Sequence, residues 1–164
     1  MGPASTVDLS PGAVLRAYAG AFAAELVAAG VRNVCICPGS RSTPLAIVLR
    51  GQPGLRSWLH LDERSASYFA LGMAKALREP VAVLATSGTA TANFAPAVAE
   101  ARFGQVPLIV LTADRPPELR EVGATQTIDQ VRMYGLHAKW SVELPLPEAT
   151  PEALRHVRAV ANRA

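Results

Sequence analysis

Apolar residues follow two alternating patterns along most of the chain. Short, wholly apolar runs that suit strands alternate with longer stretches in which apolar residues recur every three or four positions, as in amphipathic helices. Parallel strands read as continuous apolar runs because helices cover both of their faces. The pattern therefore predicts an α/β fold with a doubly wound, mostly parallel sheet and helices on both faces. The predicted strands are 31–37, 55–61, 81–85 and 107–111, and the predicted helices are 11–29, 43–49, 64–77 and 90–103.

Local signals support several of these boundaries. Ser10 followed by Pro11 is typical of a helix start, and Gly30 is typical of a helix stop. After Pro117 the periodicity is weaker. There we expect a polar loop over 123–130, a strand over 138–144 and a helix over 152–164.

Length and composition indicate one globular domain. The chain has 164 residues, of which 50% are hydrophobic and 18% are charged, which suits a soluble protein with a single core. Residues 1–10 are expected to form a flexible tail. The final predicted helix carries no glycine or asparagine stop and no loop follows it, so we expect residues 1–164 to be one domain cut from a longer chain. No apolar run reaches the roughly 20 residues of a membrane span, and no secretory signal opens the sequence, so we expect a cytoplasmic protein.

The charge distribution and the spacing of the histidines and cysteines argue against several kinds of binding site. The net charge is +3 and the arginines are dispersed, which argues against nucleic-acid binding. His60, His137 and His156 share no ligand spacing, so we expect no metal site within this chain. Cys35 and Cys37 are expected on opposite faces of a strand, as buried reduced thiols rather than as a disulfide or zinc pair.

Polar residues follow the end of each predicted strand. In open parallel sheets the ligand site lies beyond the carboxyl ends of the strands, where the loops meet. We therefore expect the chemistry of this protein to be concentrated at one edge of the sheet. The residues concerned are Ser40 with Arg41, Asp62 with Glu63, the run Thr86–Thr89, and Asp114 with Arg115.

Glu63 is the strongest candidate for a chemical role. It stands at a strand end beside the apolar face of the next helix, and desolvation there would prepare a carboxyl group to share a proton with a heterocycle nitrogen. The alternative is a helix-capping or surface acid, because acids are common in first turns. Asp62 is the more ordinary candidate for that cap.

The other polar groups are less specific. Ser40 and Arg41 could hold an anion ahead of a helix or form a tight turn with a solvated arginine. The small residues of Thr86–Thr89 permit close approach of a flat ligand, although neither a Walker lysine nor Gly-x-Gly-x-x-Gly spacing is present. Asp114 and Arg115 could form an internal ion pair. No Gly-x-Ser-x-Gly elbow indicates a nucleophilic triad.

Four longer strings carry a family resemblance. Together they resemble the 2-succinyl-5-enolpyruvyl-6-hydroxy-3-cyclohexene-1-carboxylate synthases, which are thiamine-diphosphate enzymes of menaquinone biosynthesis, and within them the N-terminal, pyrimidine-binding domain. The combination is specific, whereas the string around Glu63 alone would fit any thiamine-diphosphate decarboxylase or acetolactate synthase. The strings are Cys37–Leu45, His60–Gly72, Thr86–Asn93, and Leu111–Leu119 continued by Gly123–Ile128.

The resemblance implies a transferase, a carboligase that decarboxylates 2-oxoglutarate and adds the resulting carbanion to isochorismate. It implies thiamine diphosphate and Mg²⁺ (Mn²⁺ being the alternative metal), with the diphosphate and metal ligands in a C-terminal domain, since no Gly-Asp-Gly metal motif occurs here. It also implies a homo-oligomer, a dimer or a dimer of dimers, with sites between subunits. The isolated domain is therefore expected to be inactive.

The resemblance also implies roles for individual residues. Glu63 matches the catalytic glutamate that hydrogen-bonds the pyrimidine N1′ and favours the imino tautomer that activates the cofactor. Thr125 departs from an asparagine common in the family and leaves Gln126 in place. The implied cofactor-binding residues are Glu63, Thr86, Ser87, Gly88, Thr89 and Asn93, and the implied substrate-binding residues are Ser40, Arg41, Arg115 and Gln126.

Two rival functions stay open. Another thiamine-diphosphate carboligase or decarboxylase, such as acetolactate synthase, would require an apolar acceptor pocket in place of the arginines. A non-catalytic α/β binding module would keep the fold without the cofactor, and would have no reason to retain Glu63.

Overall fold

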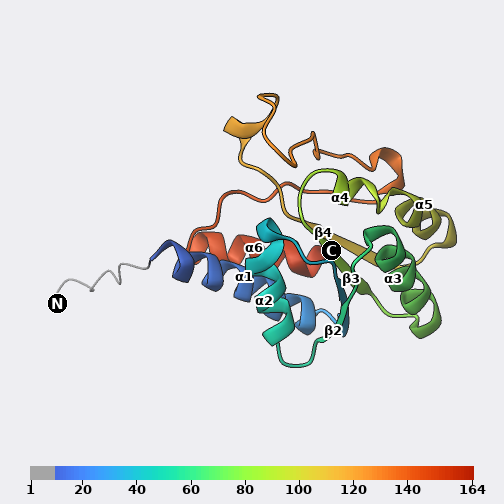
Figure 1. Ribbon diagram of the computed structural model, residues 1–164. Helices are drawn as coiled ribbons and strands as arrows, with labels where there is room; N and C mark the ends of the chain where they lie inside the picture. Colours follow the sequence, from blue (N-terminus) through green and yellow to red (C-terminus); the bar gives the residue numbers. More distant parts are fainter. Residues whose placement is uncertain (1–9) are drawn as a thin grey trace.

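The computed structural model describes residues 10–164, so the expected tail lies almost wholly outside the described residues. The described chain forms a parallel sheet between two layers of helices (Figure 1). No helix in residues 10–164 is long and apolar enough to cross a bilayer. The elements are α1 (Pro11–Ala28), β1 (Asn33–Ile36), η1 (Ser40–Ser42), α2 (Thr43–Gly51), β2 (Arg56–Leu59), α3 (Glu63–Leu77), β3 (Val81–Ala85), α4 (Thr89–Ala92), α5 (Ala95–Gly104), β4 (Leu108–Thr112), η2 (Pro117–Leu119), η3 (Gly135–His137) and α6 (Pro151–Arg163).

The strand order is β2-β1-β3-β4, and every pairing is parallel. All four strands therefore end at the same edge. The chain first builds outward from β1 to β2 and then returns to build outward from β3 to β4, so the direction of winding reverses between the neighbours β1 and β3. Ligands of doubly wound sheets bind at such a reversal, outside the carboxyl ends of the strands. The predicted fold class and four strands are confirmed, with strand ends that differ by at most two residues.

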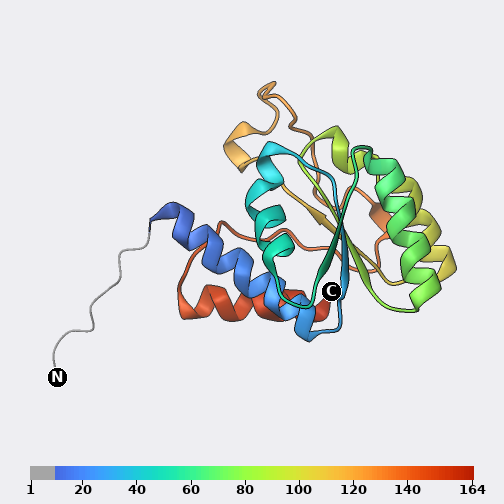
Figure 2. The same ribbon diagram turned by 60° about the horizontal axis from the view of Figure 1, so that its bottom comes forward.

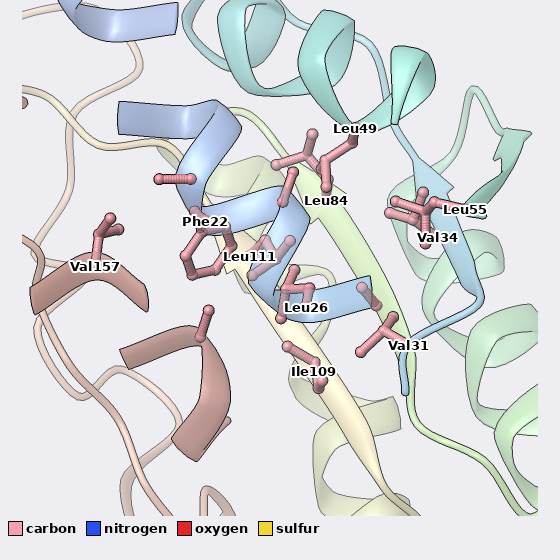
Figure 3. Packing of buried hydrophobic residues seen from close by; sticks show 14 of the residues in the cluster. Phe22, Leu26, Val31, Val34, Leu49, Leu55, Leu84, Ile109, Leu111 and Val157 are labelled. Carbon is pink, nitrogen blue, oxygen red and sulfur yellow. The ribbon is translucent and has the colours of Figure 1, made fainter. Parts of the chain in front are cut away.

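Helices α1, α2 and α6 cover one face of the sheet, and Figure 2 shows them on the side opposite α3 and α5. Ser10 caps α1, with Pro11 in its first turn and Gly30 just beyond its end at φ +105°, as predicted. Figure 3 shows Phe22 and Leu26 of α1 packed over the apolar side chains of the strands. The C-terminal helix α6 adds Val157 to the same cluster.

The other face is packed with small side chains. Ala66, Ala70 and Ala74 recur every four residues along α3 and are fully buried against the strands. Residues four apart lie on one face of a helix, so these alanines form a single stripe. Because a methyl group is short, the stripe lets the axis of α3 lie close to the sheet, with Glu63 at the end of the helix that faces the carboxyl edge.

The predicted strand over 138–144 is wrong, because the structure contains no strand there. Two of its apolar residues pack through their side chains instead of pairing through the backbone. Trp140 and Leu144 pack against the core cluster, and Arg163 of α6 stacks over Trp140 with its guanidinium carbon 4.9 Å from the ring centre. An alternating apolar pattern indicates which residues are buried, but a strand also needs a neighbouring strand to bond with.

The predicted helix over 90–103 is divided into α4 and α5. Pro96 lies in the first turn of α5. Proline has no backbone N–H, and its ring clashes with the carbonyl four residues earlier, so a helix cannot run straight through it. The break leaves Asn93 at the end of α4, turned out to solvent near the sheet edge.

The expectation that Cys35 and Cys37 lie on opposite faces is also wrong. Both are buried in the cluster under α3, because side chains two positions apart on a strand share a face. They are free thiols, as expected. Burial in apolar surroundings raises the pKa of each thiol to about 12.

These raised pKa values predict thiols that do not react in the folded protein. At about pH 8 both cysteines should stay protonated, and a thiol protonated and buried is a poor nucleophile. We expect Ellman's reagent to label the native chain slowly and to label both thiols at once after unfolding in guanidinium chloride. Rapid labelling of the native chain would show that one of the thiols is exposed or ionised.

Candidate functional site at the carboxyl edge of the sheet

The loops after β1 and β3 touch where the winding reverses. Gly39 is the point of contact, because a Cβ atom added to it would lie only 2.4 Å from Cβ of Thr86. The hydroxyls of Ser42 and Thr43 donate to the carbonyl of Gly39, at 3.1 and 3.0 Å, and fix the turn into α2. A larger residue at Gly39 would therefore force the two loops apart.

Two neighbouring acids after β2 have different environments. Asp62 is the N-cap of α3, where its carboxylate accepts from the backbone N–H of Ser65 at 2.7 Å. That hydrogen bond lowers the pKa of Asp62 below its ordinary value. Glu63 is half-buried and does not cap the helix. The side-chain amide of Asn93 donates to Oε2 of Glu63 over 3.5 Å, a long and weak contact that joins α3 to α4.

The loop after β3 is buried and closed over by a distant segment. Thr86, Ser87 and Gly88 are buried, and Thr89 is exposed at the start of α4. Gly88 has φ +77° and ψ −143°, a conformation that is essentially restricted to glycine. A Cβ atom there would meet the backbone of Gln126 at 2.9 Å.

The segment that covers this loop begins at Gln126. The hydroxyl of Ser87 donates to the carbonyl of Gln126 at 2.9 Å. Gln126 itself has φ +53°, a left-handed conformation that is uncommon outside glycine. Its backbone thus holds the loop after β3, a contact that no pattern in the sequence indicated. The Gln126 residue is exposed.

Two further residues of this segment were missed by the sequence analysis. The side chain of Gln130 accepts from the N–H of Gly88 at 2.8 Å and donates to the carbonyl of Ala113 at 2.9 Å. The hydroxyl of Tyr134 donates to the carbonyl of Thr91 at 2.8 Å, and burial raises its pKa. Neither residue belongs to a local motif, so only the tertiary structure reveals these contacts.

Arg115 follows β4, and its side chain does not form the ion pair with Asp114 that the sequence allowed. One oxygen of Asp114 accepts from the backbone N–H of Arg115 at 2.7 Å, and the other pairs with the guanidinium of Arg120 at 3.0 Å. Arg120 in turn bonds to Glu143, so the acid is occupied by local structure. The Nε atom of Arg115 is buried and has no hydrogen-bond partner in the structure. Its guanidinium therefore has donors to offer to an anion.

Ser40 and Arg41 lie exposed in η1, at the start of α2. No hydrogen bond or ion pair within residues 10–164 joins either of them to Arg115. The structure thus brings Glu63 into contact with Asn93, and the loop after β3 into contact with Gln126. Among the described residues it forms no hydrogen bond between Arg115 and either Ser40 or Arg41. The roles of all these residues stay predictions.

Metal-binding groups are not gathered in the part of the chain that the structure describes. There, no three or more His, Cys, Asp or Glu side chains lie close enough together to hold a metal ion.

Comparison with known proteins identifies the family. The family model described as "Thiamine pyrophosphate enzyme, N-terminal TPP binding domain" matches residues 16–133. The chain belongs to this thiamine pyrophosphate enzyme family. Residues 16–133 include every residue that the strings suggested as part of the site, from Ser40 to Gln126.

Individual relatives confirm the finer resemblance. A protein of Geobacillus kaustophilus is 57% identical over 150 residues, one of Chloroflexus aurantiacus 56% over 147, and one of Listeria monocytogenes 55% over 151. Each is named 2-succinyl-5-enolpyruvyl-6-hydroxy-3-cyclohexene-1-carboxylate synthase. The matches cover 90–92% of this chain and 25–26% of each relative. The chain therefore spans about a quarter of the length of the curated relatives that it matches.

The edge of the sheet fits the pyrimidine part of the cofactor that gives the thiamine pyrophosphate enzymes their name. A flat ring with a basic nitrogen needs a carboxyl partner and a surface free of bulky side chains. Glu63 supplies a half-buried carboxyl group, and the loop after β3 supplies small buried residues around Gly88. A half-buried carboxyl group beside small residues is thus chemically compatible with a flat nitrogen heterocycle.

The contact between Gly88 and Gln126 predicts that a single methyl group added at Gly88 would destabilise the fold. Gly88→Ala should lower the free energy of unfolding by about 1–3 kcal/mol from backbone strain alone, and by more from the clash. Gly72→Ala is the matched control, because Gly72 is exposed in α3 and an added Cβ meets nothing within 4 Å. That control should stabilise the helix by about 1 kcal/mol. Urea unfolding of the two variants measures both effects, and equal stabilities would contradict the geometry.

Proposed function

We propose that this chain supplies the aminopyrimidine half of a thiamine-diphosphate site in a synthase. The whole protein would decarboxylate 2-oxoglutarate and add the remaining four carbons to isochorismate, giving 2-succinyl-5-enolpyruvyl-6-hydroxy-3-cyclohexene-1-carboxylate in menaquinone biosynthesis. The observation that carries the proposal is Glu63, a half-buried carboxyl group at the carboxyl edge of the sheet, in a chain of this family. The names of the relatives support the choice of substrates.

Glu63 is proposed as the catalytic residue, acting through a proton held at the pyrimidine ring. Since Asp62 already caps α3, the carboxyl group of Glu63 can turn to a ligand. Bound thiamine diphosphate supplies the nucleophilic carbon that the 2-oxo acid needs for decarboxylation. Asn93 contacts Glu63 Oε2 and would keep the carboxyl group oriented. Thr86, Ser87, Gly88 and Thr89 would complete the cofactor surface.

The acceptor side of the proposed site is cationic. Isochorismate carries two carboxylates, and the planar fork of an arginine binds a carboxylate through two hydrogen bonds. Arg115 is proposed for this role because its backbone is fixed by Asp114 and its Nε atom is buried without a partner. Ser40, Arg41 and Gln126 would supply the other contacts. All three are exposed near the same edge.

Further features of the whole protein are proposed from the resemblance alone. They are Mg²⁺, or Mn²⁺ in its place, with the diphosphate ligands in a C-terminal domain of a three-domain chain; a homodimer or dimer of dimers with sites between subunits; and a cytoplasmic location. The isolated chain would then be inactive, because most contacts of the anionic cofactor would be missing.

Glu63→Gln in the full-length protein should lower turnover by about 10²–10⁴-fold, the usual range for loss of proton transfer in the transition state. The assay is loss of isochorismate in the presence of 2-oxoglutarate, thiamine diphosphate and Mg²⁺. Glu100→Gln is the matched control, since Glu100 is exposed on α5. Turnover of pyruvate but not isochorismate by the parent would favour an acetolactate-synthase type. No measurable activity with any 2-oxo acid would favour a non-catalytic module.

Arg115→Met should act on the acceptor alone. The change keeps an unbranched apolar stem but removes the guanidinium fork, and the loss of a charged hydrogen bond of about 1.5–3 kcal/mol predicts a KM for isochorismate about 10- to 10²-fold higher. The KM for 2-oxoglutarate and the apparent affinity for thiamine diphosphate should stay close to those of the parent. Arg102→Met, at an exposed position of α5, is the control. An equal rise in the KM values for isochorismate and 2-oxoglutarate would place Arg115 outside the acceptor site.

A further inference from the structure

Gln130 joins the loops that follow β3 and β4. Its Oε1 atom accepts from the N–H of Gly88 at 2.8 Å, and its Nε2 atom donates to the carbonyl of Ala113 at 2.9 Å. Ala113 extends the sheet by one residue, because its N–H donates to the carbonyl of Ala85. One half-buried side chain thus connects the two loops just past the end of the β3–β4 pairing.

The two contacts require an amide. Gly88 presents a backbone donor and Ala113 presents a backbone acceptor, so the side chain between them must accept at one atom and donate at the other. A glutamine does both while neutral. A glutamate of the same shape accepts at both oxygens when ionised, so it would keep the bond to Gly88 and lose the bond to Ala113.

Each end of this connection leads to a different part of the proposed site. Gly88 precedes α4, and Asn93 at the end of α4 contacts Glu63 on the cofactor side. Ala113 precedes Asp114, which fixes the backbone of Arg115 on the acceptor side. A change in the distance between Gly88 and Ala113 would therefore change the distance between the two sides.

We propose that Gln130 is a positioning residue that sets the spacing between the cofactor loop and the acceptor arginine. The inference rests on the proposed function and assigns Gln130 no contact with cofactor or substrate. Its effect should fall on the step that needs both sides at once, which is the addition to isochorismate. Decarboxylation of 2-oxoglutarate without an acceptor requires the cofactor side alone.

Other contacts hold the segment in place when Gln130 is changed. Ser87 bonds to the carbonyl of Gln126 at 2.9 Å, and Tyr134 bonds to the carbonyl of Thr91 at 2.8 Å, so the segment is attached on either side of Gln130. Substitution of Gln130 should thus release the connection between the loops and leave the fold intact.

The test compares Gln130→Glu, Gln130→Met and the parent in the full-length protein. Two rates are measured: carboligation to isochorismate, and release of CO₂ from 2-oxoglutarate without isochorismate. Loss of a hydrogen bond of about 1 kcal/mol in a spacing contact predicts a fall in carboligation of about 5- to 10-fold for each variant. The rate of CO₂ release should change by less than about 2-fold on the same grounds. Gln105→Glu, exposed beyond α5 at the opposite edge of the sheet, is the control and should match the parent.

The outcomes separate this inference from the proposed function. A selective loss of carboligation in both variants supports the inference. Carboligation by Gln130→Glu at the parent's rate would overturn it, because Gln130 would then serve only as a local partner of the Gly88 N–H. A parallel fall in both rates would also overturn it and indicate a merely structural role. A parent that turns over no isochorismate overturns the proposed function, and the inference with it.

Discussion

The four strands of the sheet are parallel and covered on both faces, and the candidate site depends on this constraint. Parallel strands end at one edge, so all of the loops that carry polar residues are brought to the same side of the molecule. The reversal of winding then places the loops after β1 and β3 next to each other. Gly39 and Thr86 meet there with no room for another side chain, which makes the edge a closely packed surface rather than a set of independent loops.

In two pairs of adjacent residues, one residue bonds to the backbone and the other is left available to a ligand. Asp62 bonds to the backbone of α3, and its neighbour Glu63 is left half-buried with one weak contact. Asp114 bonds to a backbone N–H and to Arg120, and the guanidinium of its neighbour Arg115 keeps a buried donor without a partner. In both pairs the aspartate stabilises the turn at which the other side chain is presented. The site is therefore built from residues that hold the backbone and residues left to meet a ligand.

The sequence predicts the fold class well because long apolar runs and regular helical periods report burial directly. It also predicts which loops form the edge, since parallel strands share one polarity. It fails over 138–144, where Trp140 and Leu144 pack against the core cluster without any strand to pair with. It misses Gln130 and the backbone role of Gln126, because contacts about 40 residues apart leave no local pattern. The roles of Glu63 and the arginines rest on resemblance, since their types and positions alone leave other interpretations open.

The stripe of Ala66, Ala70 and Ala74 relates the core to the chemistry of the edge. Because α3 begins with Glu63, any side chain that lifts the helix from the sheet also displaces this carboxyl group. A replacement of one of these alanines by valine would then change the contact between Glu63 and a ligand, although the added atoms lie in the core. Substitution at these three positions is accordingly limited by side-chain size more than by hydrophobicity. The same stretch of helix must both pack against the sheet and place Glu63 at the edge. In directed evolution, such buried positions offer a means of adjusting the placement of Glu63 without touching the site itself.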